Sequence, residues 1–189
     1  LASKDIHEPI KFSLRGIFKG QKIRDGLAFL GFGFEHGAGL VIWPIFIFFS
    51  ILDEQYTSLG SVTSLSLLFA SIFVMIIGKF SDAYRRIVLK ISLIVNAAIW
   101  VIKTFVKTVL QVFIIDSFYG ISSASINIPF EALSYDKANK GDIVKFIVFR
   151  EFVINIGRVI FFIIMIFVAD LTYGFILGGS AGSLLQLLF

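Results

Sequence analysis

Six apolar stretches, each about as long as a membrane-spanning helix, constrain this chain more than any other feature. They cover residues 27–52, 56–77, 87–103, 109–133, 146–169 and 171–189. A helix needs about 20 apolar residues to cross a hydrocarbon core of roughly 30 Å. Because the connecting segments are short, successive helices must run antiparallel. The sequence therefore predicts an all-α membrane protein in which residues 26–189 form a six-helix transmembrane bundle.

The composition agrees with this prediction and excludes several other classes of protein. Of 189 residues, 57% are hydrophobic and 16% are charged, whereas soluble domains are about 45–50% apolar and about 25% charged. The net charge of +4 does not indicate a nucleic-acid partner, since the basic residues lie in short segments between apolar stretches. The absence of cysteine excludes disulfides, thiolate metal sites and thiol nucleophiles. We expect no cofactor and no metal site, because the two histidines, His7 and His36, lie far apart in the chain.

The basic residues also predict the orientation in the membrane. They concentrate before the first span, between the second and third, and between the fourth and fifth: Lys4, Lys11, Arg15, Lys19, Lys22, Arg24, Lys79, Arg85, Arg86, Lys90, Lys137, Lys140 and Lys145. The opposite side has only Lys103 and Lys107, and its first loop carries the acidic pair Asp53 and Glu54. Lysine and arginine favour cytoplasmic loops. We therefore expect an integral protein of the plasma (inner) membrane with both termini in the cytoplasm.

Residues 1–25 form a basic cytoplasmic linker in this prediction. The apolar positions of residues 10–18 share one helical face, a pattern typical of a helix lying in the membrane interface. Gly16 and Gly20 weaken such a helix, so a solvated linker is an equal alternative.

Four ionisable residues lie at membrane depth within the apolar stretches: Glu35, Asp116, Glu151 and Arg158. A charge inside a bilayer is costly, so it usually faces a protein interior or a water-filled path and is a functional-site hypothesis by default. These residues suggest a protein that moves a solute.

Two polar faces accompany these charges. Residues 116, 120, 123 and 127 recur at spacings of four, three and four, which places Asp116 and Asn127 on one face of the fourth span. Glu151, Asn155 and Arg158 share a face of the fifth span in the same way. We predict that these two faces, together with Glu35 and His36, line a pathway for a substrate and for protons.

Glu35 is the predicted proton carrier. It shares a helical face with Gly31 and Gly39, which allow close helix approach or leave room for a ligand, and a carboxylate among apolar groups can bind and release a proton. The alternative is a static pair with a base such as Arg150. His36 lies about 100° further round the helix, so it cannot face the same point, and a hydrogen-bonded interior histidine is its simpler role.

Depth predicts a partner for Arg158. At about 1.5 Å per residue, Arg158 lies roughly 18 Å from the cytoplasmic start of its helix, and Asp116 lies about 10 Å below the outer surface. These depths nearly coincide in a core of roughly 30 Å. We predict an Asp116–Arg158 ion pair, either as part of the pathway or as a fixed tie within the bundle. Near the outer ends of their spans, Trp43 and Trp100 are predicted to be interfacial anchors.

The connection between the second and third spans reads Gly78-Lys79-Phe80-Ser81-Asp82-Ala83-Tyr84-Arg85-Arg86. Gly78 permits a tight exit from the helix. Asp82 can accept hydrogen bonds at the next helix N-terminus, and Arg85 and Arg86 can bind a carboxylate on a neighbouring element. An ordinary basic cytoplasmic turn is the alternative.

This segment resembles the signature loop of the major facilitator superfamily. Gly78, Phe80, Ser81, Asp82 and Arg86 match, whereas the family usually has a basic residue at the position of Ala83 and glycine at that of Arg85. Such departures are more typical of the second copy of the loop. The fourth span supports the same half, because Asp116 stands four residues before Gly120, where the family often has arginine. The motif Pro129-Phe130-Glu131-Ala132-Leu133, with Lys140-Gly141 after it, is similar to the segment at the end of the fourth and tenth helices of the family.

The resemblance implies the C-terminal six-helix half of such a transporter, with the other half in the same parent protein; a six-helix protomer that dimerises is the alternative. It also implies that the 78–86 loop latches the cytoplasmic gate, so that Gly78, Asp82, Arg85 and Arg86 act in gating. The expected function is secondary active transport of a small solute by alternating access, coupled to protons. A non-transporting membrane scaffold on the same bundle is the second hypothesis. No enzyme activity is expected, because a two-histidine metal motif, a nucleophile elbow and cysteine are all missing.

Overall fold

The structure, a computed structural model, describes residues 22–168 and 170–189, without the side chains of residues 76–83. The predicted interfacial helix, His7 and nearly all of the linker over residues 1–25 lie outside the described residues. The side chain of Asp82 lies outside them too.

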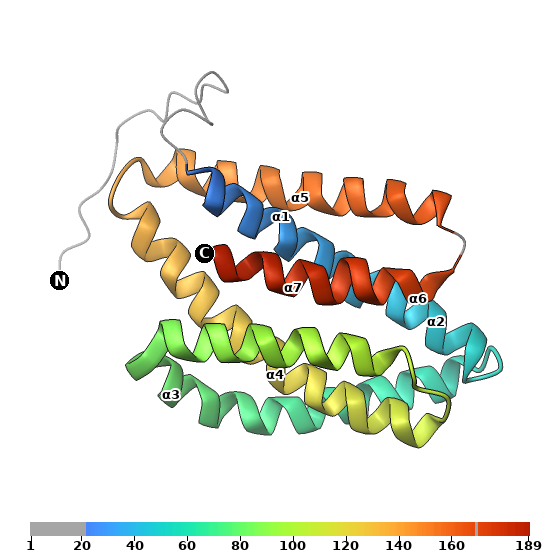
Figure 1. Ribbon diagram of the computed structural model, residues 1–189. Coiled ribbons are helices and arrows are strands. Elements are labelled where there is room, and N and C mark those ends of the chain that lie inside the picture. Colours follow the sequence, from blue (N-terminus) through green and yellow to red (C-terminus); the bar gives the residue numbers. More distant parts are fainter. Residues whose placement is uncertain (1–21, 169) are drawn as a thin grey trace.

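The described chain is all-helical and folds into six helices (Figure 1). The first is continuous and consists of α1 (Ile23–Gly37), a π-helical turn η1 (Ala38–Ile42) and α2 (Trp43–Ser50). The long element α3 (Tyr56–Lys103) supplies two helices, because the backbone of Tyr84 (φ −136°, ψ 44°) leaves helical geometry and the chain reverses there. After it come α4 (Val109–Ala138) and α5 (Ile143–Phe167). The last helix consists of α6 (Leu171–Gly174), η2 (Phe175–Ala181), α7 (Gly182–Leu185) and η3 (Gln186–Leu188).

Four helices in the described ranges are long and apolar enough to cross a membrane: Ile23–Ser50, Tyr56–Met75, Val109–Ala138 and Leu171–Leu188. Four of the six predicted spans are thus confirmed by length and composition, as in an integral membrane protein. The helix α5 and the second part of α3 are not among these candidate spans, because every 18-residue stretch of each contains more than two charged residues. The predicted helix exit at Gly78 is wrong, since helical backbone continues to the reversal at Tyr84.

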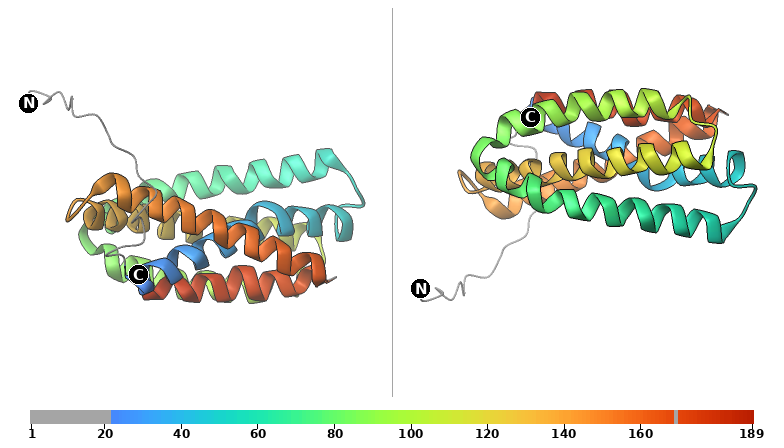
Figure 2. Two further views of the ribbon diagram at one scale, coloured as in Figure 1. Left: turned by 90° about the horizontal axis from the view of Figure 1, so that it is seen from above. Right: turned by 90° about the horizontal axis from the view of Figure 1, so that it is seen from below.

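The helices run alternately up and down, as predicted from the short connections (Figures 1 and 2). The start of α1, the reversal in α3, the α4–α5 loop and the C-terminal end of the last helix gather at one end of the bundle. The basic connections predicted to be cytoplasmic therefore lie together. We call this the basic end, and the opposite one the far end.

Polar side chains cap three of these helices. Thr108 and Gln111 form a reciprocal capping box at the start of α4. The backbone N–H of Lys145 donates to Asp142 (3.1 Å) at the start of α5, and that of Thr172 donates to Asp170 (2.8 Å) at the start of α6. These hydrogen bonds to the charged form lower the pKa of each of the two carboxyl groups.

The first helix packs against α5 and the last helix at glycine contacts. A Cβ atom on Gly157 of α5 would lie 2.6 Å from the carbonyl oxygen of Leu30, and one on Gly31 would lie 2.6 Å from that of Gly182. Such close approach needs residues without side chains, as in other membrane helix pairs. Of the two roles predicted for Gly31, close helix approach is the one that the structure shows. These contacts set the position of the first helix relative to α5 and the last helix.

Large apolar side chains cover much of the outer surface. In the first part of α3, Leu67, Ile72 and Met75 are each more than half exposed. Further round the bundle, Ile94 and Ile166 are exposed to a similar extent. A water-facing surface of this kind is unusual, whereas lipid accommodates it, which agrees with the membrane-spanning lengths of the helices.

Candidate functional site: a charged cavity between α1, α4 and α5

A cavity of about 360 Å³ lies between α1, α4 and α5. Its lining residues are Phe32, His36, Asn127, Glu131, Arg150, Glu151, Ile154 and Arg158. The cavity exists because α5 packs tightly on α1 while α4 and α5, although consecutive in the chain, touch at few points. Six of these eight residues are polar or charged, which is unusual for helices this apolar.

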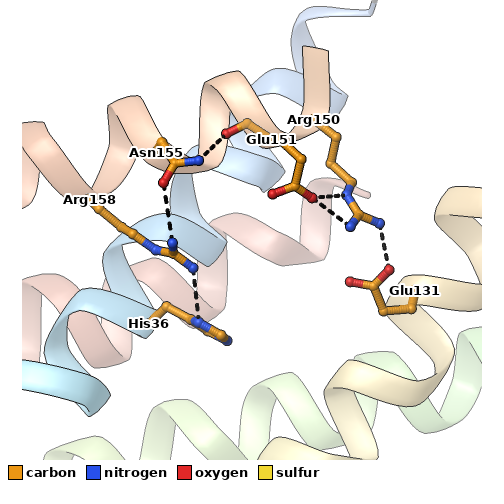
Figure 3. Close-up of polar contacts among 6 residues, drawn as sticks. All are labelled: His36, Glu131, Arg150, Glu151, Asn155 and Arg158. Atoms are coloured by element: carbon orange, nitrogen blue, oxygen red, sulfur yellow. Dashed lines mark hydrogen bonds and ion pairs between the residues drawn. The ribbon is translucent and has the colours of Figure 1, made fainter. Parts of the chain in front are cut away.

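Arg150 is held by two carboxylates on one side of the cavity (Figure 3). Its guanidinium forms an ion pair with Glu131 of α4 and another with the adjacent Glu151, at 2.7 Å. The Arg150 side chain is only 10% exposed, whereas those of Glu131 and Glu151 are 41% and 50% exposed. The three residues, which we call the Arg150 cluster, therefore carry one negative charge in excess, on a face that is open.

Arg158 lies two turns further along α5, and its partners are neutral. One terminal nitrogen lies 3.2 Å from Nδ1 of His36, and the other donates to Oδ1 of Asn155 at 3.3 Å (Figure 3). Its Nε atom is buried and has no hydrogen-bond partner among the described residues. Because a guanidinium can only donate, His36 must accept at Nδ1, so a neutral ring carries its proton on Nε2.

The cavity brings together most of the residues that the sequence placed on a pathway. His36, Asn127, Glu151 and Arg158 line it, and Asn155 bonds to Arg158. Sequence analysis missed the roles of Glu131 and Arg150. A signal for Glu131 was present, since adding one more step of four to the polar series of α4 moves from Asn127 to Glu131.

Glu35 lies in a different cluster, turned away from the cavity. It is buried, and its Oε1 atom accepts hydrogen bonds from Tyr119 (2.8 Å), Asn96 (3.2 Å) and Trp100 (3.3 Å). The alternative pairing with Arg150 is wrong, because Arg150 binds the two other glutamates. As predicted, Glu35 and His36 face different points.

Asp116 does not pair with Arg158, so that prediction is wrong. Its Oδ1 atom lies 3.2 Å from Nζ of Lys103, and it accepts a hydrogen bond of 2.7 Å from Trp43. The depth argument placed Asp116 and Arg158 at one level but could not tell which helix faces which. Asp116 belongs to the face of α4 that packs on α3, and Arg158 points toward α1.

The sequence analysis placed Lys103 on the side of the membrane opposite the basic loops. In the structure this residue is completely buried. Its ammonium lies about 4 Å from three aromatic rings, at 4.1 Å from Trp43, 4.4 Å from Trp100 and 3.9 Å from Tyr119. Each ring face attracts a cation. The prediction that both tryptophans anchor at the membrane interface is therefore wrong, because Trp43 and Trp100 are buried and enclose this lysine.

The gate motif is described in part. Arg85 forms an ion pair of 3.0 Å with Asp136 at the end of α4, so the expectation that it binds a carboxylate on a neighbouring element is confirmed. Arg86 lines a second cavity of about 420 Å³ at the basic end. Nearby, Lys137 pairs with Asp25 at 2.6 Å and ties α4 to α1.

Comparison with known proteins adds no relative to this chain. No protein-family model matches it, and no curated protein or solved structure does so either. The site therefore stands on its geometry: charged and polar side chains from three helices that converge on a cavity inside a largely apolar, membrane-type bundle.

Proposed function

We propose that this chain is a six-helix half of a secondary active transporter that moves a small solute across the membrane by alternating access. The charged cavity between α1, α4 and α5 is the observation that carries the proposal. Ionisable groups at membrane depth mark substrate and ion pathways, and transporter sites lie near the midplane between structural repeats. We further propose the fold of the major facilitator superfamily, on the strength of the loop motif and the six-helix topology.

The exposed side of the cavity supports a second half. Glu131 and Glu151 are about half exposed, and Asn155 lies on the same face of α5 as Glu151. A carboxylate cannot face lipid without a large cost. Another six-helix body, from the same parent protein or from a second copy, would cover this face and enclose a water-filled path.

The basic end fits the role of a cytoplasmic gate. Arg85 and Asp136 link the α3 reversal to the end of α4, and exposed ion pairs of this type are weak and can open during a transport cycle. In this proposal Gly78, Asp82 and Arg86 act in the gate together with Arg85 and Asp136. The protein lies in the plasma (inner) membrane, and both termini of the six-helix half face the cytoplasm.

Glu35 is the proposed coupling carboxylate. The described hydrogen-bond donors to it, Tyr119, Asn96 and Trp100, are all neutral. Glu35 can therefore gain a proton without leaving an unpaired cation behind. A carboxylate in an ion pair, such as Asp116, does not have this freedom.

A membrane scaffold without transport is the second candidate. It is favoured by the pairs Lys103–Asp116 and Arg150 with its two glutamates, which satisfy most buried charges statically. Arg158 argues against it, because its guanidinium has no carboxylate partner among the described residues, and a charge at membrane depth without a counter-charge is costly for a purely structural bundle.

Transport in proteoliposomes distinguishes the two. With an imposed proton gradient and a panel of small solutes, we expect uptake by the parent protein. In Glu35→Gln we expect gradient-driven uptake to be lost and solute exchange to persist, because the amide keeps the hydrogen bonds but cannot carry a proton. Unchanged uptake in Glu35→Gln would remove this residue from coupling. No movement of any solute by the parent protein would favour the scaffold.

A further inference from the structure

The two arginines of the cavity share its two carboxylates unequally. Arg150 serves two carboxylates, and within the part of the chain that the structure describes Arg158 forms no ion pair. Glu151 and Arg158 are seven residues apart on α5, or about 10 Å at about 1.5 Å per residue. Both carboxylates of the Arg150 cluster bind Arg150, and no described ion pair joins either of them to Arg158.

We propose that Arg158 and His36 bind an anionic group, a carboxylate or a phosphate, of a small solute in this cavity. The proposal names the substrate class for the proposed function and rests on it for the transport step. Binding itself can be measured without transport.

Hydrogen-bond capacity supports this assignment. A guanidinium has five N–H donors in a planar fork that matches carboxylate and phosphate groups. Arg158 uses two terminal nitrogens in bonds of 3.2 and 3.3 Å to neutral acceptors, and its Nε atom has no described partner. Donors therefore remain for a ligand. His36 adds one more, because its Nδ1 atom accepts from Arg158 and no hydrogen bond among the described residues uses its Nε2–H.

The surroundings fit a small anion rather than a large one. The cavity volume of about 360 Å³ is near the lower end of ligand sites, which span about 300–1,000 Å³. Phe32 and Ile154 provide apolar walls, and Phe32 stacks on the His36 ring with centroids 4.4 Å apart. This stacking holds the imidazole in place beside Arg158. The Arg150 cluster, negative overall, discourages an anion from binding at its own end.

The test uses the full chain in dodecylmaltoside micelles and measures the unfolding temperature with added ligand. Benzoate is compared with benzamide, and glycerol phosphate with glycerol, so that each anion has a neutral partner of similar shape. We expect saturable stabilisation at millimolar concentration by at least one anion, and none by its neutral partner. Stabilisation by the neutral partners alone, or by no anion, would overturn the proposal.

Variants locate the effect. Arg158→Gln should weaken anion binding by roughly 10- to 100-fold, because it removes charged hydrogen bonds, and Arg158→Lys should keep part of the affinity and protect the fold. Arg24→Gln is the matched control, since Arg24 is an exposed arginine that does not line the cavity. Equal anion affinity in the parent and in both Arg158 variants would place the site elsewhere and contradict the inference.

Two further outcomes separate this inference from neighbouring explanations. If added phosphatidylglycerol stabilises the protein through Arg158 and the soluble anions do not, the site binds lipid headgroups and the solute assignment is wrong. Anion binding that depends on Arg158, without transport in proteoliposomes, would leave the site standing and overturn the proposed function. If the protein transports a neutral solute and the transport rate is unchanged in Arg158→Gln, the proposed function stands and the anion site is overturned.

Discussion

Replacing Lys103 by methionine is expected to destabilise the protein by about 3–5 kcal/mol, the usual cost of removing one partner of a buried ion pair. Methionine fills much of the same volume among Trp43, Trp100 and Tyr119, but it leaves the Asp116 carboxylate without its cation. The side chain of Asp116 is only 13% exposed, so water cannot replace the ammonium fully. The free energy of unfolding in mixed dodecylmaltoside–SDS micelles measures this loss.

Two controls show whether the pair itself is responsible. Adding Asp116→Asn to the Lys103→Met protein removes the uncompensated charge and should recover most of the stability, because the amide can still accept the hydrogen bond from Trp43. Lys107→Met changes an exposed lysine in the same connection and should have little effect. An equal loss in the single and double variants would mean that Lys103 stabilises through its aromatic contacts and not through Asp116.

Gly33→Ala is expected to destabilise the protein by about 1–3 kcal/mol, the typical cost of overpacking. A Cβ atom at this position would clash with the carbonyl oxygen of Ile154, and the backbone nitrogen of Arg158 would lie only 3.1 Å away. Backbone atoms cannot swing aside as a side chain can, so α1 and α5 would have to separate. Because His36 and Arg158 lie on these two helices, anion affinity should fall together with stability.

Gly26→Ala is the matched control on the same helix. Its Cβ atom would meet only the ring of Phe149, at an ordinary contact distance of 3.5 Å. Alanine is a better helix former than glycine by about 0.8–1.0 kcal/mol, so this change should be neutral or stabilising. A similar loss of stability in both variants would show that the first helix tolerates no added methyl group anywhere, and that the clash at Gly33 is not special.

Much of the architecture could be read from the amino-acid sequence. The apolar stretches indicated six antiparallel helices, because a helix in lipid must bury its backbone polar groups in its own hydrogen bonds and short loops leave no other path. The period of 3.6 residues grouped Glu151, Asn155 and Arg158 on one face and separated Glu35 from His36. Helix ends were less well predicted, as at Gly78, where the chain continues as helix and reverses only at Tyr84.

Side-chain partners depended on the tertiary structure. Periodicity tells which residues share a face, but not which neighbouring helix that face meets, so Asp116 was matched to Arg158 when Lys103 is its partner. Lys103 stands at the end of a helix beside a loop, so its position in the sequence made it look like a loop charge. Only the tertiary structure shows that its ammonium is buried beside Asp116. Backbone contact at Gly33 and Gly157 draws α5 onto α1, away from α4. That packing decided that Arg150 would hold two carboxylates and that Arg158 would face the cavity, where its described partners are the neutral side chains of His36 and Asn155.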